Sequence, residues 1–427
     1  MIGTLFLAAI LLFFVAGAPL FLLLGGAAMY CLHFLEGDTL AVIIGDVYQL
    51  VSNPVLVAIP LFTFAGYILA ESGMPARLVT FNRALGGWMP GSLPWVTLLS
   101  CALFTAFTGA SGVTIVALGG LLLPSLVGDG YSERFSLGLV TSSGSLGLLF
   151  PPSIPVILYG VVAKIQIESI FLAGLVPGLV ILGALGAYGM WVAGREGVPR
   201  HAFSMKNLAQ AFRATAWELP LPLLILGGIY GGVATVTEVA ALTVVYACLV
   251  EVVIYRDIPL SRIFKICMES GKMVGAVLLI LAMALAFAKF IILYDIPDRA
   301  VELMSGLIQD QMSFLTPKIA FLLLLNLMLL VVGCFLDIFS AIMVVVPLIL
   351  PIAREFQVAP LHLAIIFLVN LEIGYCTPPV GLNLFIASFR FRKSVVSLYR
   401  ATLPFLLLRI VILLVITYWE KLSLLFS

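Results

Sequence analysis

Long apolar runs, each separated from the next by a short charged stretch, occupy most of this chain of 427 residues. The hydrocarbon core of a bilayer is about 30 Å thick, so a helix needs roughly 20 predominantly apolar residues to cross it. Inside lipid every backbone polar group must be hydrogen-bonded within the protein, which favours helices. These constraints predict an all-α integral membrane protein. The apolar runs cover residues 2–35, 54–70, 92–127, 135–163, 169–193, 216–254, 273–294, 317–353, 361–389 and 401–418.

The composition excludes a water-soluble fold and several classes of function. Hydrophobic residues make up 63% of the chain and charged residues 10%, against roughly half and a quarter in soluble domains. A net charge of +1, without a basic tract interleaved with aromatic residues, argues against a nucleic-acid partner. The six cysteines stand singly with no CxxC pair, so we expect core residues and no metal or redox centre. The apolar N-terminus lacks a basic region, which indicates a retained first span instead of a cleaved signal peptide.

The distribution of lysine and arginine predicts how the spans are oriented. Basic residues gather after residue 194, after residue 255 and from 390 to 400, and the positive-inside rule places such loops in the cytoplasm. They fall on one side if 216–254 forms two short spans joined near Gly231-Gly232. The same assignment requires 92–127 and 317–353 to be re-entrant hairpins.

A few charged residues lie outside those loops. Lys289 and Arg409 are placed near span ends, and Lys289 is expected to snorkel to the interface. The amphipathic stretch 297–309 is expected either to lie along the outer surface or to brace the scaffold. Glu302 and Asp310 either contact a partner protein or form a solvated face.

An internal repeat is the most informative pattern in the sequence. In each half, an apolar hairpin with Leu-Pro near its end is followed by a span, a Pro-Pro helix break, a half-helix and another span. Five crossings separate the halves in this topology, so the halves face opposite ways across the membrane. Inverted repeats with paired broken helices are typical of secondary transporters, whose binding site lies where the breaks meet near the midplane. The matched residues, all 227 positions apart, are Pro124 and Pro351, Gly147 and Gly374, Pro151-Pro152 and Pro378-Pro379, and Pro177 and Pro404.

The repeat divides the chain into four predicted parts. Residues 1–72 are N-terminal scaffold helices, and residues 194–316 are connecting scaffold helices. Repeat 1, residues 73–193, consists of the hairpin 92–127, the broken helix 135–163 and the following helix 169–193. Repeat 2, residues 317–427, consists of the hairpin 317–353, the broken helix 361–389 and the final helix 401–418.

Polar clusters at the two hairpin tips and the two helix breaks supply the candidate site. Helix breaks expose backbone carbonyls, and hydroxyl, amide and carboxylate groups add the hard oxygen ligands that a partly dehydrated Na⁺ prefers. Half-helix N-termini after the prolines present free N–H groups that suit a carboxylate. The candidate Na⁺ ligands are Thr108, Gly109, Ser111, Ser143, Gly144, Asp337, Asn370, Gly374, Cys376 and Thr377. The candidate substrate-binding residues are Ser145, Gly147, Ser153, Thr377, Gly381 and Asn383.

Each cluster also has a purely structural interpretation. The glycines at 109 and 112 could serve helix packing alone. A simple proline kink at Pro151-Pro152 is conceivable, but it does not predict a matching partner later in the chain. Asp337 is the one acid near the second hairpin tip, and an ionisable group inside a membrane is functional by default. For Asn370, hydrogen bonding to other polar groups stays an open alternative.

At these positions the sequence resembles the large membrane subunit, of the DctM type, of tripartite ATP-independent periplasmic (TRAP) transporters. The resemblance runs over nearly the whole chain, and its motifs are specific in combination. One departure is Val236, where the family more usually has proline. The motifs are TGASG at 108–112, GGLLLP at 119–124, GLLFPPS at 147–153, GGVATVTE at 231–238 and TPPVGLN at 377–383.

The resemblance implies a multi-pass importer of the bacterial inner membrane with an ion-transporter-like fold, an elevator motion and coupling to two or more Na⁺ ions. It also implies two partners, a periplasmic substrate-binding protein and a small four-helix membrane subunit. Because no extra four-helix block flanks the repeats, we expect the small subunit to be a separate chain. Substrates in the family are C4-dicarboxylates, sialic acid and other organic acids.

Other functions fit the sequence less well. An intramembrane hydrolase would need a nucleophile and a base, and this topology places none of His33, His201 and His362 near Ser111, so no enzymatic activity is expected. A channel would not account for paired inverted breaks. A stand-alone Na⁺- or H⁺-coupled carrier of dicarboxylates or other organic anions satisfies the same physics and stays the alternative.

Overall fold

A computed structural model describes residues 20–30, 54–86, 91–198, 204–293 and 315–426, together with a few single positions between these ranges. Within them every regular element is a helix and no strand is present. By length and composition, eight of these helices could cross a membrane, or up to nine spans if the bent pair Glu133–Leu149 and Ile154–Ala163 counts as one. The prediction of an all-α membrane protein is confirmed.

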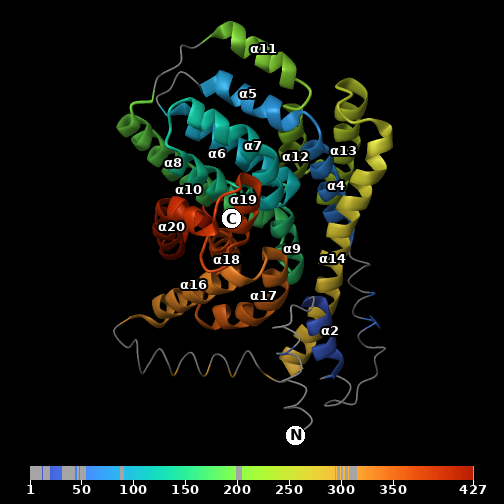
Figure 1. The fold of residues 1–427 in the computed structure, drawn as a ribbon. Coiled ribbons are helices and arrows are strands. Elements are labelled where there is room, and N and C mark those ends of the chain that lie inside the picture. Colours follow the sequence, from blue (N-terminus) through green and yellow to red (C-terminus); the bar gives the residue numbers. More distant parts are fainter. Residues whose placement is uncertain are drawn as a thin grey trace.

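A column of scaffold helices runs along one side of the molecule (Figure 1). It contains α2 (Leu20–Tyr30), η2 (Pro54–Val57), α4 (Ala58–Glu71), α12 (Pro220–Tyr230), α13 (Val236–Cys248), the π-helical turn η4 (Leu249–Ile254) and α14 (Leu260–Leu293). In this column α14 packs against α2 and α4, and α13 packs against α4 and α12. Thr235 caps α13 in a capping box with Glu238, so the helix starts at Val236 although no proline stands there.

Two amphipathic helices lie at one end of the molecule, at the top of Figure 1. They are α5 (Met74–Gly86), which follows α4 after a two-residue bend, and α11 (Met205–Thr215). The rings of Phe81 and Phe212 join them, with centroids 6.5 Å apart. α5 also packs along α6 (Ser92–Thr108), so it links the scaffold column to the first repeat.

The two repeats contain matching elements in the same order. Repeat 1 consists of α6, α7 (Ser111–Gly128), α8 (Glu133–Ser143), η3 (Leu146–Leu149), α9 (Ile154–Ala163) and α10 (Ile167–Glu196). Repeat 2 consists of α16 (Pro317–Phe335), α17 (Ile338–Glu355), α18 (Pro360–Gly374), α19 (Leu382–Phe391), α20 (Val395–Tyr418) and the short α21 (Lys421–Leu424). α7 and α17 start and end 227 residues apart, the offset of the proline and glycine pairs in the sequence.

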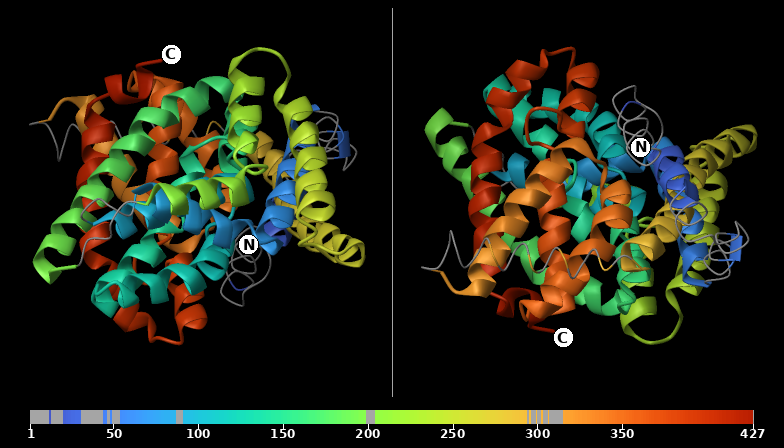
Figure 2. Two further views of the ribbon diagram at one scale, coloured as in Figure 1. Left: turned by 90° about the horizontal axis from the view of Figure 1, so that it is seen from above. Right: turned by 90° about the horizontal axis from the view of Figure 1, so that it is seen from below.

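The repeats interlock into one body beside the scaffold column (Figure 2). α7 of repeat 1 packs against α19 of repeat 2, and α17 of repeat 2 packs against α9 of repeat 1. α8 lies beside α20, and α10 lies beside α18. Because the exchange is reciprocal, each hairpin touches the broken helix of the other repeat.

Two placements made from the sequence differ from the structure. The prediction that Arg409 lies near a span end is wrong: the residue lies in the middle of α20, and its side chain is buried. The predicted span at 273–294 starts earlier, because α14 begins at Leu260 with a charged and largely exposed first half. The predictions for 2–19, 31–53 and 297–309, and the side chain of Lys289, lie largely outside the described residues.

Candidate functional site

The first hairpin turns between α6 and α7 at a glycine in the left-handed region. Gly109 has a φ of +64°, and its N–H donates to Thr105 O over 2.8 Å. A Cβ at Gly109 would lie 2.5 Å from the Ile154 side chain, so the tip fits closely against the start of α9. Thr108 Oγ1 is buried and has no hydrogen-bond partner within the described ranges.

The second hairpin turns at Asp337, which caps α17. Asp337 Oδ1 accepts hydrogen bonds from the N–H groups of Phe339 and Ser340 over 3.0 Å each, and Oδ2 accepts one from the Ser340 hydroxyl. The N–H of Ile338 donates to Tyr375 Oη over 2.9 Å, which ties the tip to the second helix break. The carboxylate predicted as a Na⁺ ligand is therefore also a helix cap.

The polar groups of the first helix break differ in how they are hydrogen-bonded. Ser143 Oγ donates back to Leu139 O in its own helix. Gly144 O accepts a hydrogen bond from Thr105 Oγ1 over 2.8 Å. Ser153 Oγ is buried at the start of α9, and no donor or acceptor in the described part of the chain reaches it.

In the second break, Thr377 and Gly381 bond to the chain around them. Thr377 Oγ1 donates to Ile373 O over 3.0 Å. Gly381 has a φ of +57°, and its N–H donates to Cys334 O of α16 over 3.2 Å. The Pro378–Pro379 bond is cis, as is the matching Pro151–Pro152 bond of the first break.

Asn370 bonds within a buried polar network away from the hairpin tips. Its amide donates to Asn326 Oδ1 over 2.7 Å and to Ile366 O over 2.8 Å. Asn326 in turn donates to Thr417 Oγ1 over 3.1 Å. This arrangement favours the structural interpretation of Asn370, although its own Oδ1 accepts no hydrogen bond from the described residues.

The two breaks and the first hairpin tip meet in the middle of the interlocked body. Ser145 Oγ donates to Glu372 O over 3.4 Å, and these residues are themselves 227 positions apart. Ser111 Oγ at the first tip donates to Asn383 Oδ1 at the start of α19 over 2.7 Å. Asn383 Nδ2 contacts Cys376 Sγ at 3.9 Å. Residues from both repeats thus lie at one place, as the sequence predicts.

A buried ion pair lies beside this meeting point, and the sequence reasoning missed it. Arg409 Nη2 of α20 pairs with Glu372 Oε1 of α18 at 3.0 Å and donates to Ser142 O of α8 over 2.7 Å. Both side chains are only 2% exposed. The signal was present in the sequence, since Arg409 interrupts the apolar run 401–418, and an arginine inside a membrane segment rarely lacks a role.

A cavity of about 710 Å³ lies between the hairpin tips and the scaffold column. Gly109, Ser111 and Asp337 line it from the two tips, and Tyr375 lines it from the second break. Tyr67 of α4 and two residues of α14 line the scaffold side. The other predicted site residues are not among those that line this cavity.

The side-chain atoms around the breaks are mostly oxygens, which are ligands of hard cations and not of soft transition metals. Buried oxygens without a hydrogen-bond partner in the described chain include Thr108 Oγ1, Thr141 Oγ1 and Ser153 Oγ. Hydroxyl and carbonyl oxygens are the ligands of hard cations. The described residues contain no group of three or more His, Cys, Asp and Glu that could hold a metal.

Two comparisons identify what the chain is similar to. Residues 7–422 match the family model described as the tripartite ATP-independent periplasmic transporter, DctM component. The C4-dicarboxylate TRAP transporter large permease protein DctM of Pseudomonas aeruginosa is 36% identical over 373 residues, which cover 86% of this chain and 85% of that protein.

A longer relative and a solved structure extend the comparison. The isethionate TRAP transporter permease protein DctMQ of Oleidesulfovibrio alaskensis is 32% identical over 418 residues, and the match covers 97% of this chain but only 65% of that protein. The YdaH transporter of Alcanivorax borkumensis has a similar fold, with a TM-score of 0.65, 15% identity and coverage of 89% of this chain and 87% of that chain.

Proposed function

Since this chain belongs to the DctM family of tripartite ATP-independent periplasmic transporters, we propose that it is the large membrane subunit that carries the substrate across the bilayer. The proposed substrate is a small organic acid of the C4-dicarboxylate or sialic acid class. The C4-dicarboxylate and the isethionate named for two relatives are both small organic anions, which supports this class.

The observation that carries the proposal is the convergence of both repeats on one cavity. The Ser145 to Glu372 contact joins the two breaks, and the Ser111 to Asn383 contact joins the first hairpin tip to the second broken helix. A substrate in the cavity would touch both hairpin tips at once. Binding there is therefore sensitive to any rearrangement of either repeat, as alternating access requires.

Charge in and around the cavity supports an anion bound together with Na⁺. α19 begins at the cavity edge, with Leu382 in the lining, and the N-terminal end of a helix favours negative charge. Asp337, Glu71 and Glu269 also line the cavity, and their carboxylates would repel an organic acid unless a cation lies between them. Na⁺ coordinated by Asp337 and by tip oxygens would supply that cation and couple the two fluxes.

An elevator motion is the proposed mechanism. The hairpins and broken helices of the two repeats interlock, so they would move as one body. That body contacts the scaffold column through α4 and α14, which pack against α6 and α17. Sliding of the body along these two helices would carry the cavity from one side of the membrane to the other. The scaffold would stay fixed in the bacterial inner membrane.

Two partners complete the proposed system. A periplasmic binding protein would deliver the organic acid, and a small four-helix membrane subunit would pack against the scaffold. No catalytic step is proposed, because transport requires binding and movement alone.

Reconstitution into liposomes tests the proposal. We expect labelled succinate or sialic acid to accumulate when an inward Na⁺ gradient, the small subunit and the cognate binding protein are all present. Omitting the binding protein or replacing Na⁺ with K⁺ should each abolish accumulation. Na⁺-driven uptake without the binding protein would contradict the tripartite assignment and favour a stand-alone carrier.

A further inference from the structure

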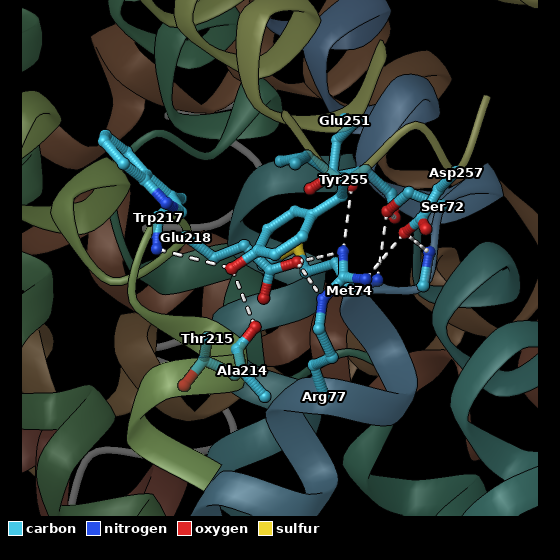
Figure 3. Close-up of polar contacts among 12 residues, drawn as sticks. Ser72, Met74, Arg77, Ala214, Thr215, Trp217, Glu218, Glu251, Tyr255 and Asp257 are labelled. Carbon is cyan, nitrogen blue, oxygen red and sulfur yellow. Dashed lines mark hydrogen bonds and ion pairs between the residues drawn. The ribbon is translucent and has the colours of Figure 1, made fainter. Parts of the chain in front are cut away.

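A buried ionic cluster joins α5 to the scaffold at the end of the molecule where the amphipathic helices lie (Figure 3). At its centre is Arg77 of α5. Three carboxylates surround this guanidinium: Glu218 from the turn before α12, Glu251 from the π-helical turn η4, and Asp257 from the segment that leads to α14. Because these acids come from separate elements, the ion pairs connect α5 to three parts of the scaffold.

Each of the three guanidinium nitrogens of Arg77 donates a hydrogen bond to a different carboxylate. Arg77 Nε donates to Glu218 Oε1 over 2.7 Å, Nη2 donates to Glu251 Oε2 over 2.9 Å, and Nη1 donates to Asp257 Oδ2 over 2.6 Å. The Tyr255 ring lies against the guanidinium, with its centroid 4.0 Å from Cζ. None of these hydrogen bonds reaches Glu218 Oε2 or Glu251 Oε1.

The charge of the cluster does not balance with all three acids ionised. Three carboxylates against one guanidinium leave two negative charges, and the side chains of Glu218 and Glu251 are only 4% and 0% exposed. Asp257 is 26% exposed and can be screened by water, whereas the other two acids cannot. Two like charges buried side by side disfavour ionisation of one of them.

Charged residues on the neighbouring helices do not offset this imbalance. Arg83 pairs with Asp129, and Arg262 pairs with Glu71. α6 and α12 contribute no charged residue. Among the side chains that the structure describes, the remaining charged residues of α11, α14 and the segment before α14 are exposed, and no ion pair joins them to Glu218 or Glu251: Lys206, Arg213, Arg256, Lys265, Glu269 and Lys272.

Two oxygens of the cluster are left without a donor. Glu218 Oε2 and Glu251 Oε1 are buried and accept no hydrogen bond from any group in the described ranges. The two carboxyl groups lie within hydrogen-bonding reach of each other. A proton on one of them would convert this contact between acceptors into a hydrogen bond and would remove one of the excess charges.

We propose that Glu218 and Glu251 share one bound proton, which makes the pair a proton-binding site at the joint between α5 and the scaffold. In support, burial raises the pKa of Glu218 above its ordinary value of 4.5, and the nearby guanidinium of Arg77 only partly opposes this shift. The site is separate from the central cavity, since none of the four charged residues of the cluster lines it.

The proton has a consequence for the first hairpin. α5 packs along α6, and the N–H of Gly73 before α5 donates to Asp257 Oδ2 over 2.8 Å. Loss of the proton would leave three negative charges around the single guanidinium. Their repulsion would weaken the attachment of α5 at the base of this hairpin. A folded pair that keeps its proton above pH 4.5, where an unfolded glutamate loses it, contributes stability that falls as the pH rises towards the raised pKa.

Infrared spectroscopy of the purified full-length protein tests the proton directly. We expect the wild type to show the C=O stretching band of a protonated carboxylic acid at neutral pH. The band should lose intensity in both Glu218→Gln and Glu251→Gln, because either single variant leaves one carboxylate that pairs with Arg77 and needs no proton. Glu133→Gln, which alters an exposed partner of Lys393, is the matched control and should leave the band unchanged.

Absence of any carboxylic acid band in the wild type overturns the proposal, and so does an unchanged band in either Gln variant of the pair.

Hydrogen exchange of the α5 amides, corrected for intrinsic rates, gives a second readout. As long as the folded protein keeps the proton on the pair, the equilibrium constant for opening of wild-type α5 should increase by up to about tenfold per pH unit. In Glu251→Gln this constant should depend less on pH. If the opening equilibrium of wild-type α5 does not change between pH 4.5 and the raised pKa of the pair, the proposal is overturned, even if a variant fails to fold.

Discussion

Arg409 places a fixed positive charge in the middle of α20, where the C-terminal ends of two half-helices converge. Its guanidinium bonds to Ser142 O in the last turn of α8 and to the carboxylate of Glu372 near the end of α18. The C-terminal end of a helix carries partial negative charge, so a cation at this point stabilises both ends. Arg409 therefore joins the two broken helices electrostatically, one from each repeat.

Replacing Arg409 with alanine should strongly destabilise the protein. The change leaves Glu372 buried without its cation, and breaking a buried pair in this way costs about 3–5 kcal/mol. We expect Arg409→Ala to lower the midpoint of thermal unfolding in detergent, and Arg409→Ala/Glu372→Gln to recover part of the loss. Arg400→Ala, at an exposed position of the same helix, should change the stability by less than about 0.5 kcal/mol. If the double variant is no more stable than the single one, the ion pair is not the source of the effect.

Ser111→Ala removes the hydrogen bond between the first hairpin tip and Asn383. A hydrogen bond of this kind contributes about 0.5–1.5 kcal/mol, so the protein should stay folded while uptake and its activation by Na⁺ weaken. Ser125→Ala lies on the same helix and only loses a bond to its own backbone, so it is the control. Unchanged Na⁺ activation in proteoliposomes would remove Ser111 from the site.

Asp337→Asn separates the charge of Asp337 from its capping role. Asparagine caps a helix about as well as aspartate, so α17 should keep its start and its stability. The variant removes one of three acidic side chains from the cavity wall, and Glu71 and Glu269 stay. We expect a higher Na⁺ concentration for half-maximal uptake in the same assay, and an unaltered Na⁺ dependence would mean that Asp337 is a cap only.

At the scale of elements, one glycine in each break brings a hairpin arm into close contact. A Cβ at Gly147 would lie 2.2 Å from Ala102 O of α6, and a Cβ at Gly374 would lie 2.5 Å from the carbonyl carbon of Gly333 of α16. These glycines are 227 residues apart in the chain and hold the first arm of their own hairpin. Their identity is explained by backbone packing, whether or not they also face a substrate.

Gly147→Ala and Gly374→Ala should each push a hairpin arm away from its break. Overpacking of a tight contact costs about 1–3 kcal/mol, and we expect both variants to melt at lower temperature and to transport more slowly. Gly183→Ala is the control, because nothing lies within 4 Å of a Cβ there. Wild-type stability in either break variant would show that the backbones can separate at little cost.

The element order was predictable, because prolines and glycines recur at one constant offset and the two Pro-Pro pairs fall between helices, although Pro124, Pro351, Pro177 and Pro404 lie inside helices. The constant offset between Pro124, Gly147 and their partners predicts both hairpins and both broken helices from the sequence alone. Pairings between distant helices were not predictable. The Glu372 to Arg409 pair and the Asn370 to Asn326 bond connect residues on different elements, and no local pattern in the chain encodes which side chains meet.

At the scale of the whole molecule, the reciprocal packing of the repeats explains why one cavity can respond to two hairpins. α7 lies against α19 and α17 lies against α9, so the tips approach the same point from different elements. If the repeats are inverted, the bases of the hairpins must lie on opposite sides of the membrane. This inversion is the central claim, since alternating access through one site depends on it.

Cysteine labelling tests the inversion most directly. Gly128 and Glu355 end the second arms of the two hairpins, lie 227 residues apart, and are both exposed. In a background without the six native cysteines, Gly128→Cys and Glu355→Cys are probed with an impermeant maleimide in intact cells and in inverted vesicles. We predict that Gly128→Cys reacts only in inverted vesicles and Glu355→Cys only in intact cells. Labelling of both from the same side would contradict the inverted repeat.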